Sequence, residues 1–103
     1  MLRSNPAMGL KERVLSTHCE QIKTLAATRK AASIALIGSV ARGDDDEDSD
    51  YDFLVGFVDG ASLFDLAGLQ LDLEELLGRS ADVVSRGALT ARDRGMLKDA
   101  IPL

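Results

Sequence analysis

The chain has 103 residues, 46% of them hydrophobic and 28% charged, with a formal net charge of −5 at pH 7. This length predicts one domain over residues 1–103 with a modest core, and the composition excludes a disordered chain. The basic residues are scattered and form no cationic stripe, so we expect no direct nucleic-acid binding.

The cellular setting follows from cysteine usage and hydropathy. Cys19 is the single cysteine, so an intrachain disulfide is impossible, and no Cys/His cluster suggests a zinc site. The longest apolar run, residues 31–41, is interrupted and too short to cross a bilayer, and residues 1–10 lack the hydrophobic stretch of a secretion signal. We therefore expect a cytoplasmic protein that does not associate with membranes.

The first half of the chain predicts one helix and two strands. Apolar positions recurring every three or four residues predict a long helix over residues 6–29. Its buried stripe comprises Leu10, Val14, His18, Ile22 and Leu25. The run Ser-Ile-Ala-Leu-Ile-Gly at residues 33–38 predicts a buried strand. Residues 51–58 predict a second strand, with Tyr51, Phe53, Val55 and Phe57 on one face.

The second half predicts a helix, a strand and another helix. Ser62 and Asp65 have the spacing of a capping box, and the leucine-rich stretch that follows predicts a helix over residues 63–77, ending at Gly78. Residues 81–85 predict a short strand, and Thr90 with Asp93 predicts a last helix toward residue 101. The order α, β, β, α, β, α indicates an α/β (α+β) fold.

Two familiar loop motifs are excluded. Residues 38–43 have the glycine spacing of a phosphate loop, but Asp44 and Asp45 stand where Lys and Ser or Thr are required. The alternating aspartates that begin at Asp44 have the spacing of a calcium loop. Its sixth position is Ser49 instead of Gly, and its twelfth is Val55 instead of Glu. Neither a Walker-type loop nor an EF-hand fits.

A different geometry fits the acidic segment. Asp50 and Asp52 are two residues apart at the start of a strand, so their side chains are expected on one face, opposite Tyr51. Two adjacent carboxylates repel each other unless a cation neutralises them, and Mg²⁺ prefers such oxygen ligands together with substrate phosphates. Gly38 permits close approach of the backbone, and the Ser39 hydroxyl and nearby amides can hold phosphate oxygens. The pattern predicts a phosphoryl-transfer site.

These residues resemble the active-site signature of polymerase β-type nucleotidyltransferases: Gly-Ser, a short helical Ala-Arg-Gly, an acidic spacer and Ser-Asp-x-Asp, over residues 38–52. The form Gly-Ser-x-Ala-Arg-Gly and the short chain are similar to the minimal nucleotidyltransferases of the MntA-like antitoxins, which are paired with HEPN ribonuclease toxins. The resemblance implies the nucleotidyltransferase fold, with a small mixed sheet of three to four strands packed against helices.

The resemblance also implies site residues and partners. Asp50 and Asp52 would hold metal, with two Mg²⁺ ions expected, and Gly38 and Ser39 would bind the phosphates of ATP. Arg42 would support that loop or the phosphates, although it could instead only balance the acidic loop. The expected reaction moves AMP from ATP to a hydroxyl, namely a tyrosine of a HEPN toxin, in a hetero-oligomer.

The family uses a third carboxylate on a neighbouring strand. Asp82 is the expected one, because it lies in a β-branched run while the other late acids belong to a helix. It would bind the catalytic metal and accept the proton of the attacking hydroxyl. The acids at residues 44–48 are expected to be solvated spacer. The competing hypothesis is a module without catalysis that neutralises its partner by binding alone.

Overall fold

The computed structural model describes residues 9–46, 48–88 and 98–103. The elements in chain order are α1 (Leu10–Glu12), the π-helical turn η1 (Arg13–Thr17), α2 (Cys19–Thr28), β1 (Ala31–Ile37), α3 (Gly38–Arg42), β2 (Tyr51–Phe57), α4 (Leu63–Leu77), β3 (Ala81–Ser85), the 3-10 turn η2 (Arg86–Ala88) and β4 (Ile101–Pro102). In this described part, no helix has the length and apolar character needed to span a bilayer.

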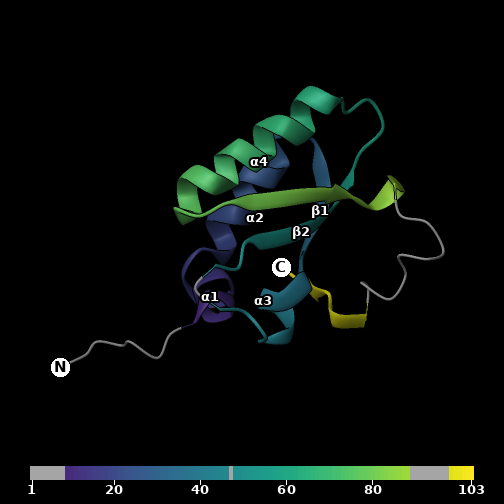
Figure 1. Cartoon of the computed structure of the whole chain (residues 1–103). Coiled ribbons are helices and arrows are strands. Elements are labelled where there is room, and N and C mark those ends of the chain that lie inside the picture. Colours follow the sequence, from purple (N-terminus) through teal and green to yellow (C-terminus); the bar gives the residue numbers. More distant parts are fainter. Residues whose placement is uncertain (1–8, 47, 89–97) are drawn as a thin grey trace.

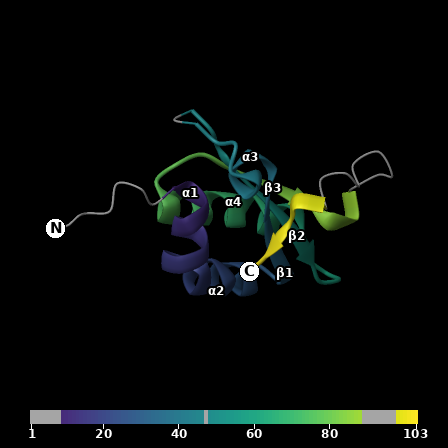
Figure 2. The same ribbon diagram turned by 90° about the horizontal axis from the view of Figure 1, so that it is seen from below.

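The strands form one mixed sheet in the order β3-β2-β1-β4. β1 runs antiparallel to both β2 and β4, whereas β2 and β3 are parallel and are joined through α4. Figure 1 shows α4 running alongside β3, and Figure 2 shows the short strand β4 beside β1. The predicted α+β class with a small mixed sheet packed against helices is confirmed.

The main core lies between the sheet and the helices α2 and α4. Alternate residues of the three longer strands point into it, including Ile34, Leu36, Tyr51, Phe53, Val55, Ala81 and Val83, where they meet Ile22 and Ala26 of α2 and Leu69 and Leu73 of α4. The predicted apolar face of residues 51–57 is therefore confirmed. The opposite face of the sheet holds a smaller buried cluster of Ala35, Ile37 and Leu54, with Val84 and Ala100 packed against it.

The helix α4 begins and ends as its sequence predicts. The Ser62 hydroxyl accepts a hydrogen bond from the amide of Phe64 (3.2 Å), and the Asp65 carboxylate accepts one from the amide of Ser62 (2.9 Å), which completes the capping box. Gly78 ends the helix in the left-handed region at φ 68°.

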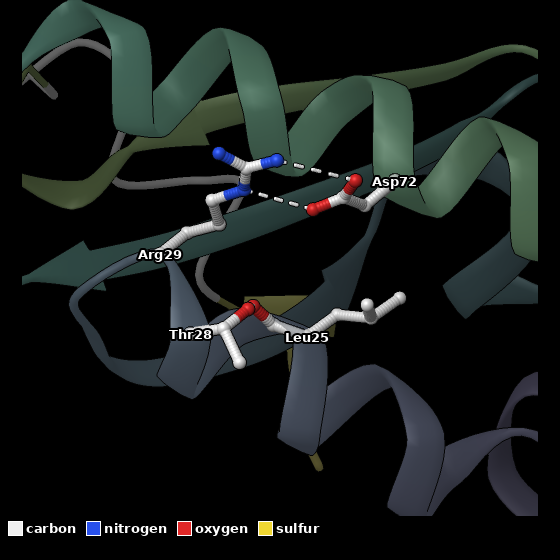
Figure 3. Close-up of polar contacts among 4 residues, drawn as sticks. All are labelled: Leu25, Thr28, Arg29 and Asp72. Atoms are coloured by element: carbon white, nitrogen blue, oxygen red, sulfur yellow. Dashed lines mark hydrogen bonds and ion pairs between the residues drawn. The ribbon is translucent and has the colours of Figure 1, made fainter.

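One partly buried ion pair joins α4 to the end of α2 (Figure 3). The Arg29 Nε donates to Asp72 Oδ2 at 2.8 Å, and a second guanidinium nitrogen lies 3.4 Å from Oδ1. The guanidinium also lies over Gly68, where an added β carbon would come within 2.6 Å of it. Glycine at this position of α4 thus leaves room for the ion pair.

The first predicted helix is not continuous. It begins at residue 10 in the described residues, because residues 1–8, including the predicted first turn at Pro6, lie outside them. A π-helical turn follows α1, with the amide of His18 bonded to the carbonyl of Arg13 (3.0 Å), and His18 separates this turn from α2. The first turn of α2 is closed by a hydrogen bond from the amide of Ile22 to the carbonyl of His18 (2.8 Å). The extra residue in this turn interrupts the α-helical spacing of apolar residues on which the prediction of one continuous helix was based.

The predicted bounds of two other elements are wrong. The first strand starts at Ala31, two residues early, and ends at Ile37, because Gly38 already belongs to α3. The last helix was predicted to reach Ile101, but Ile101 lies in β4, opposite Leu36 of β1. The predicted start of that helix, at Thr90 and Asp93, lies outside the described residues. A two-residue strand is fixed by its pairing partner and has no periodicity of its own.

Candidate active site

Two of the predicted carboxylates lie on adjacent strands. Asp52 of β2 and Asp82 of β3 are register partners in the parallel pair. Because side chains alternate along a strand, both share the sheet face of Leu54 and Val84, away from α2 and α4. The structure therefore brings Asp82 to Asp52, as predicted.

Asp50 lies directly before β2 and is exposed, whereas Asp52 is half-buried. Burial raises the pKa of the Asp52 carboxyl above its ordinary value of 3.8, and the negative charges of Asp82 and Asp50 raise this pKa further. The positive charge of Arg42 acts in the opposite direction and lowers it. The negative charges of Asp50 and Asp82 thus both act on Asp52, and a cation would offset these like charges.

Gly38 packs directly against the Asp52 carboxylate. Ile37, the residue before it, is the register partner of Asp52, so the turn from β1 into α3 passes over that side chain. Gly38 has φ 77°, and a β carbon there would lie 2.5 Å from Asp52 Oδ2. Both the left-handed backbone and the lack of space require glycine at this position. The close approach of the Gly38 backbone to the acidic group is therefore built into the fold.

Ser39 and Arg42 lie in α3, which continues from this turn. Ser39 is half-buried, and its carbonyl accepts the amide of Asp44 at 2.9 Å. Arg42 is exposed and its Nε bonds Asp44 Oδ2 at 3.1 Å, so it does balance the acidic loop. Its positive charge also lowers the pKa of the Asp52 carboxyl, although burial and the neighbouring carboxylates shift that pKa more strongly.

The acidic loop is closed by its own hydrogen bonds. Asp46 Oδ1 accepts the amide of Asp48 (2.9 Å), and the amide of Asp46 donates to the Ser49 hydroxyl (2.8 Å). The carboxylate of Asp46 is therefore engaged in holding the loop. That residues 44–48 serve only as a spacer stays a prediction.

Sequence reasoning missed a second group of residues, which fixes the backbone around Asp50. Arg79 Nη1 donates to the Ser49 carbonyl at 2.7 Å, and the amide of Tyr51 donates to the Ser80 carbonyl at 3.0 Å. A lone arginine after a helix-ending glycine carries no periodic or motif signal, so only the fold reveals this role.

The side chains of α4 satisfy the outer edge of β3. Glu74 Oε2 accepts the amide of Ala81 (3.0 Å), and Gln70 Oε1 accepts the amide of Val83 (3.3 Å). These bonds cover edge amides that would otherwise be open to pairing with another strand. They also fix the strand that carries Asp82.

The donor chemistry of the site fits magnesium bound together with a nucleotide. Within residues 9–46, 48–88 and 98–103, no three acidic, histidine or cysteine side chains form a group that could hold a metal ion, so Asp50, Asp52 and Asp82 do not form one. Mg²⁺ in nucleotide enzymes is usually held by one or two carboxylates plus substrate phosphates. Adjacent carboxylates beside a glycine turn suit that shared type of site.

A family model for the nucleotidyltransferase domain matches residues 18–102. The chain belongs to the nucleotidyltransferase family. MJ0435 of Methanocaldococcus jannaschii, a protein adenylyltransferase by assigned name, is 44% identical over 72 residues, which cover 70% of this chain and 71% of that protein. Protein adenylyltransferase MntA of Thermococcus cleftensis is 36% identical over 78 residues, which cover 76% of each chain.

Solved structures agree with this membership. One described as a minimal nucleotidyltransferase has a TM-score of 0.80 at 43% identity and covers 96% of this nucleotidyltransferase and 100% of that chain. A complex of the tri-AMPylated Shewanella oneidensis HEPN toxin with its MNT antitoxin gives a TM-score of 0.62 at 19% identity, covering 81% of this chain and 66% of that one. The second likeness shows the shared fold alone. The chain is thus an enzyme of the nucleotidyltransferase class.

Proposed function

We propose that this nucleotidyltransferase transfers AMP from ATP to a hydroxyl of a protein, namely a tyrosine of a HEPN-type toxin with which it forms a hetero-oligomer, and so acts as an antitoxin. The observation that carries the proposal is the register pairing of Asp52 with Asp82, beside Asp50 and the Gly38 turn. The names of the two adenylyltransferase relatives support AMP as the transferred group. The Shewanella complex supports a HEPN partner.

Each site residue has a role in this proposal. Asp50, Asp52 and Asp82 would hold Mg²⁺, with two ions expected, and the Gly38 and Ser39 turn would bind the nucleotide phosphates. Bound metal would neutralise charge that develops on the α-phosphate. Arg42 lies where its charge acts on the same group, and we assign it to support of the phosphates and the loop.

The proposed reaction is a single displacement at phosphorus. The acceptor oxygen attacks the α-phosphorus, a new P–O bond forms, and the bond to the departing pyrophosphate breaks. Asp82 accepts the proton of the attacking hydroxyl, and its exposure leaves it open to an acceptor brought by a second protein. Asp50 and Asp52, through the Mg²⁺ that they would hold, would orient the triphosphate for in-line attack.

The second candidate function is neutralisation by binding without catalysis. A bound partner could be silenced by occlusion alone, without any reaction. The intact Gly38–Ser39 turn together with the three carboxylates argues for the catalytic reading, because neutralisation by occlusion requires none of them. The two functions predict different results for variants of the carboxylates.

The test is a labelling reaction with the protein encoded by the neighbouring gene. Wild type, Asp50→Ala and Asp52→Ala are each incubated with ATP labelled in the α-phosphate, Mg²⁺ and that partner. Asp59→Ala, an exposed acid in the loop after β2, is the matched control. We expect label on the partner with wild type and control, and a loss of at least about a hundredfold with the site variants.

Two further measurements separate the candidate functions. A tyrosine acceptor is identified by mass spectrometry of the labelled partner and by loss of label when that tyrosine is changed to phenylalanine. Two results together would establish occlusion and overturn the enzymatic proposal. The partner would carry no label after incubation with wild type, and both site variants would still neutralise the partner as well as wild type does.

A further inference from the structure

Asp50 lies outside the strands, so the ladder of hydrogen bonds in the sheet does not fix its position. It lies one residue before β2, is exposed, and follows a loop rich in like charges. Repulsion among neighbouring carboxylates favours their separation when no cation is bound. If Asp50 is to bind a metal ion together with Asp52, the backbone on either side of Asp50 must therefore be held in place.

The segment Arg79–Ser80 provides an anchor on both sides. The Arg79 guanidinium bonds the carbonyl of Ser49 at 2.7 Å, and the Ser80 carbonyl accepts the amide of Tyr51 at 3.0 Å. These two bonds tie the backbone on either side of Asp50 to the Arg79–Ser80 segment, in addition to the bonds of Ser49 with Asp46 inside the loop. A hydrogen bond from a guanidinium is charge-assisted and stronger than one between neutral groups.

The same segment leads directly into the strand that carries Asp82. Arg79 follows Gly78 at the end of α4 and precedes β3 by two residues, and the first amide of β3 is held by Glu74. One short stretch of backbone therefore fixes the position of Asp50 relative to Asp82, on the two strands whose register pairs Asp52 with Asp82. Movement of the stretch would change the separation of the carboxylates.

We propose that Arg79 is a positioning residue of the transferase site, which sets the distance between Asp50 and the other two carboxylates by anchoring the Ser49 carbonyl. This inference rests on the proposed function, because it assigns Arg79 to the assembly of the metal-nucleotide site. The proposed role of Arg79 involves no contact with substrate or metal. It acts through the backbone that carries Asp50.

The experiment compares Arg79→Met, Arg79→Gln and Arg79→Lys with Arg29→Met. Arg29 is the matched control, because it is also a partly buried arginine with a long-range partner, but its partner is Asp72, away from the site. For each folded variant we measure Mn²⁺ binding in the presence of a nonhydrolysable ATP analogue, kcat and KM for ATP, and amide hydrogen exchange at Asp50 and Tyr51.

We expect Arg79→Met and Arg79→Gln to weaken Mn²⁺ binding and lower kcat by about tenfold or more, as loss of a partner that orients ligands does. KM for ATP should change less, and exchange at Tyr51 should accelerate. Arg79→Lys keeps a cationic donor and should recover part of the Mn²⁺ affinity. Arg29→Met should lower the thermal midpoint and leave Mn²⁺ binding and kcat at the wild-type level.

Wild-type Mn²⁺ affinity and kcat in the folded Arg79→Met variant would overturn the inference. If Arg79→Met does not fold, wild-type values in Arg79→Gln would overturn it instead. An equal loss of Mn²⁺ affinity in Arg29→Met would also do so, because it would mark a general effect of reduced stability. A wild-type protein that neither binds Mn²⁺ with nucleotide nor transfers AMP would overturn the proposed function itself.

Discussion

Asp52 and Asp82 face each other across the parallel strands β2 and β3, so two acidic side chains occupy neighbouring positions on one face of the sheet. Adjacent strands are about 4.8 Å apart, a separation at which unpaired carboxylates repel. Burial of Asp52 adds to that cost. In the absence of a cation, the site is therefore expected to reduce the stability of the fold.

The first prediction is that Asp52→Asn stabilises the metal-free protein while abolishing transfer. The folded-state pKa of Asp52 is raised above its ordinary value of 3.8, so the folded state binds this proton more tightly than the unfolded chain. The folded protein therefore loses stability as the pH rises past the pKa that Asp52 has in the unfolded chain. This loss is complete once the pH exceeds the pKa of Asp52 in the folded protein. Asparagine removes this loss.

Thermal unfolding measured with a chelator from about pH 4 to about pH 7 checks this prediction. The midpoint of Asp52→Asn should exceed that of wild type at neutral pH, and the two should converge as the pH falls. Asp59→Asn, outside the site, should follow the wild-type curve. A thermal midpoint for Asp52→Asn below that of wild type at neutral pH would contradict the destabilising effect assigned to the buried Asp52 carboxylate.

The second prediction concerns Gly38 and uses Gly43 as its control. Both glycines have positive φ, 77° and 81°, but a β carbon at residue 43 would meet nothing within 4 Å, whereas one at residue 38 would strike the Asp52 carboxylate. Either alanine variant should lose about 1–2 kcal/mol of stability from backbone strain. Gly38→Ala alone should also displace Asp52 and lower kcat at least about tenfold.

Denaturant unfolding and single-turnover transfer on both alanine variants check the second prediction. If both variants lose activity equally, the contact between residue 38 and Asp52 is not the cause.

The third prediction is a coupling between Gly68 and the ion pair of Arg29 with Asp72. Gly68→Ala gains about 0.8–1 kcal/mol of helix propensity, but its β carbon occupies the place of the Arg29 guanidinium. In an Arg29→Met background that conflict is gone. We therefore expect Gly68→Ala to be more stabilising there than in wild type, by about 0.5 kcal/mol or more, in a double-mutant cycle. Additive effects would show that the guanidinium moves aside at no cost.

The fourth prediction tests the start of α4. Ser62→Ala removes the hydroxyl that accepts the amide of Phe64 and should cost about 1 kcal/mol of stability. The capping box lies at the end of the β2–α4 connection, remote from the start of β2 that carries Asp52, so kcat should not change. Urea unfolding and transfer assays check both parts, and a fall in kcat at a temperature where the variant is fully folded would contradict them.

The elements that the sequence predicts well are those specified by local chemistry. The capping box at Ser62 and the stop at Gly78 bound α4 correctly, and the alternation from Tyr51 to Phe57 identifies the buried face of β2. Asp82 could be chosen because a β-branched run marks its strand. The parallel pairing of that strand, and its register against Asp52, come from the fold and were not predicted.

The features that escaped prediction depend on contacts distant in sequence. The strand at Ile101 exists because Leu36 offers a pairing edge, and nothing in the residues around 101 signals it. The π-helical turn before His18 inserts an extra residue into the apolar pattern of residues 6–29, whose spacing in the sequence is that of a regular α-helix. Arg79 owes its role to a carbonyl thirty positions earlier in the chain. Such pairings come from the closed fold and not from spacing.

Whether Asp50 and Asp52 bind metal together with nucleotide can be seen in a crystal structure of the nucleotidyltransferase with Mn²⁺ and a nonhydrolysable ATP analogue, because manganese is located by its anomalous scattering. We expect a manganese peak about 2.0–2.3 Å from carboxylate oxygens of Asp50 and Asp52, with the triphosphate against Gly38 and Ser39 and Asp82 beside the α-phosphate. Manganese and nucleotide bound elsewhere, with these carboxylates free, would contradict this expectation.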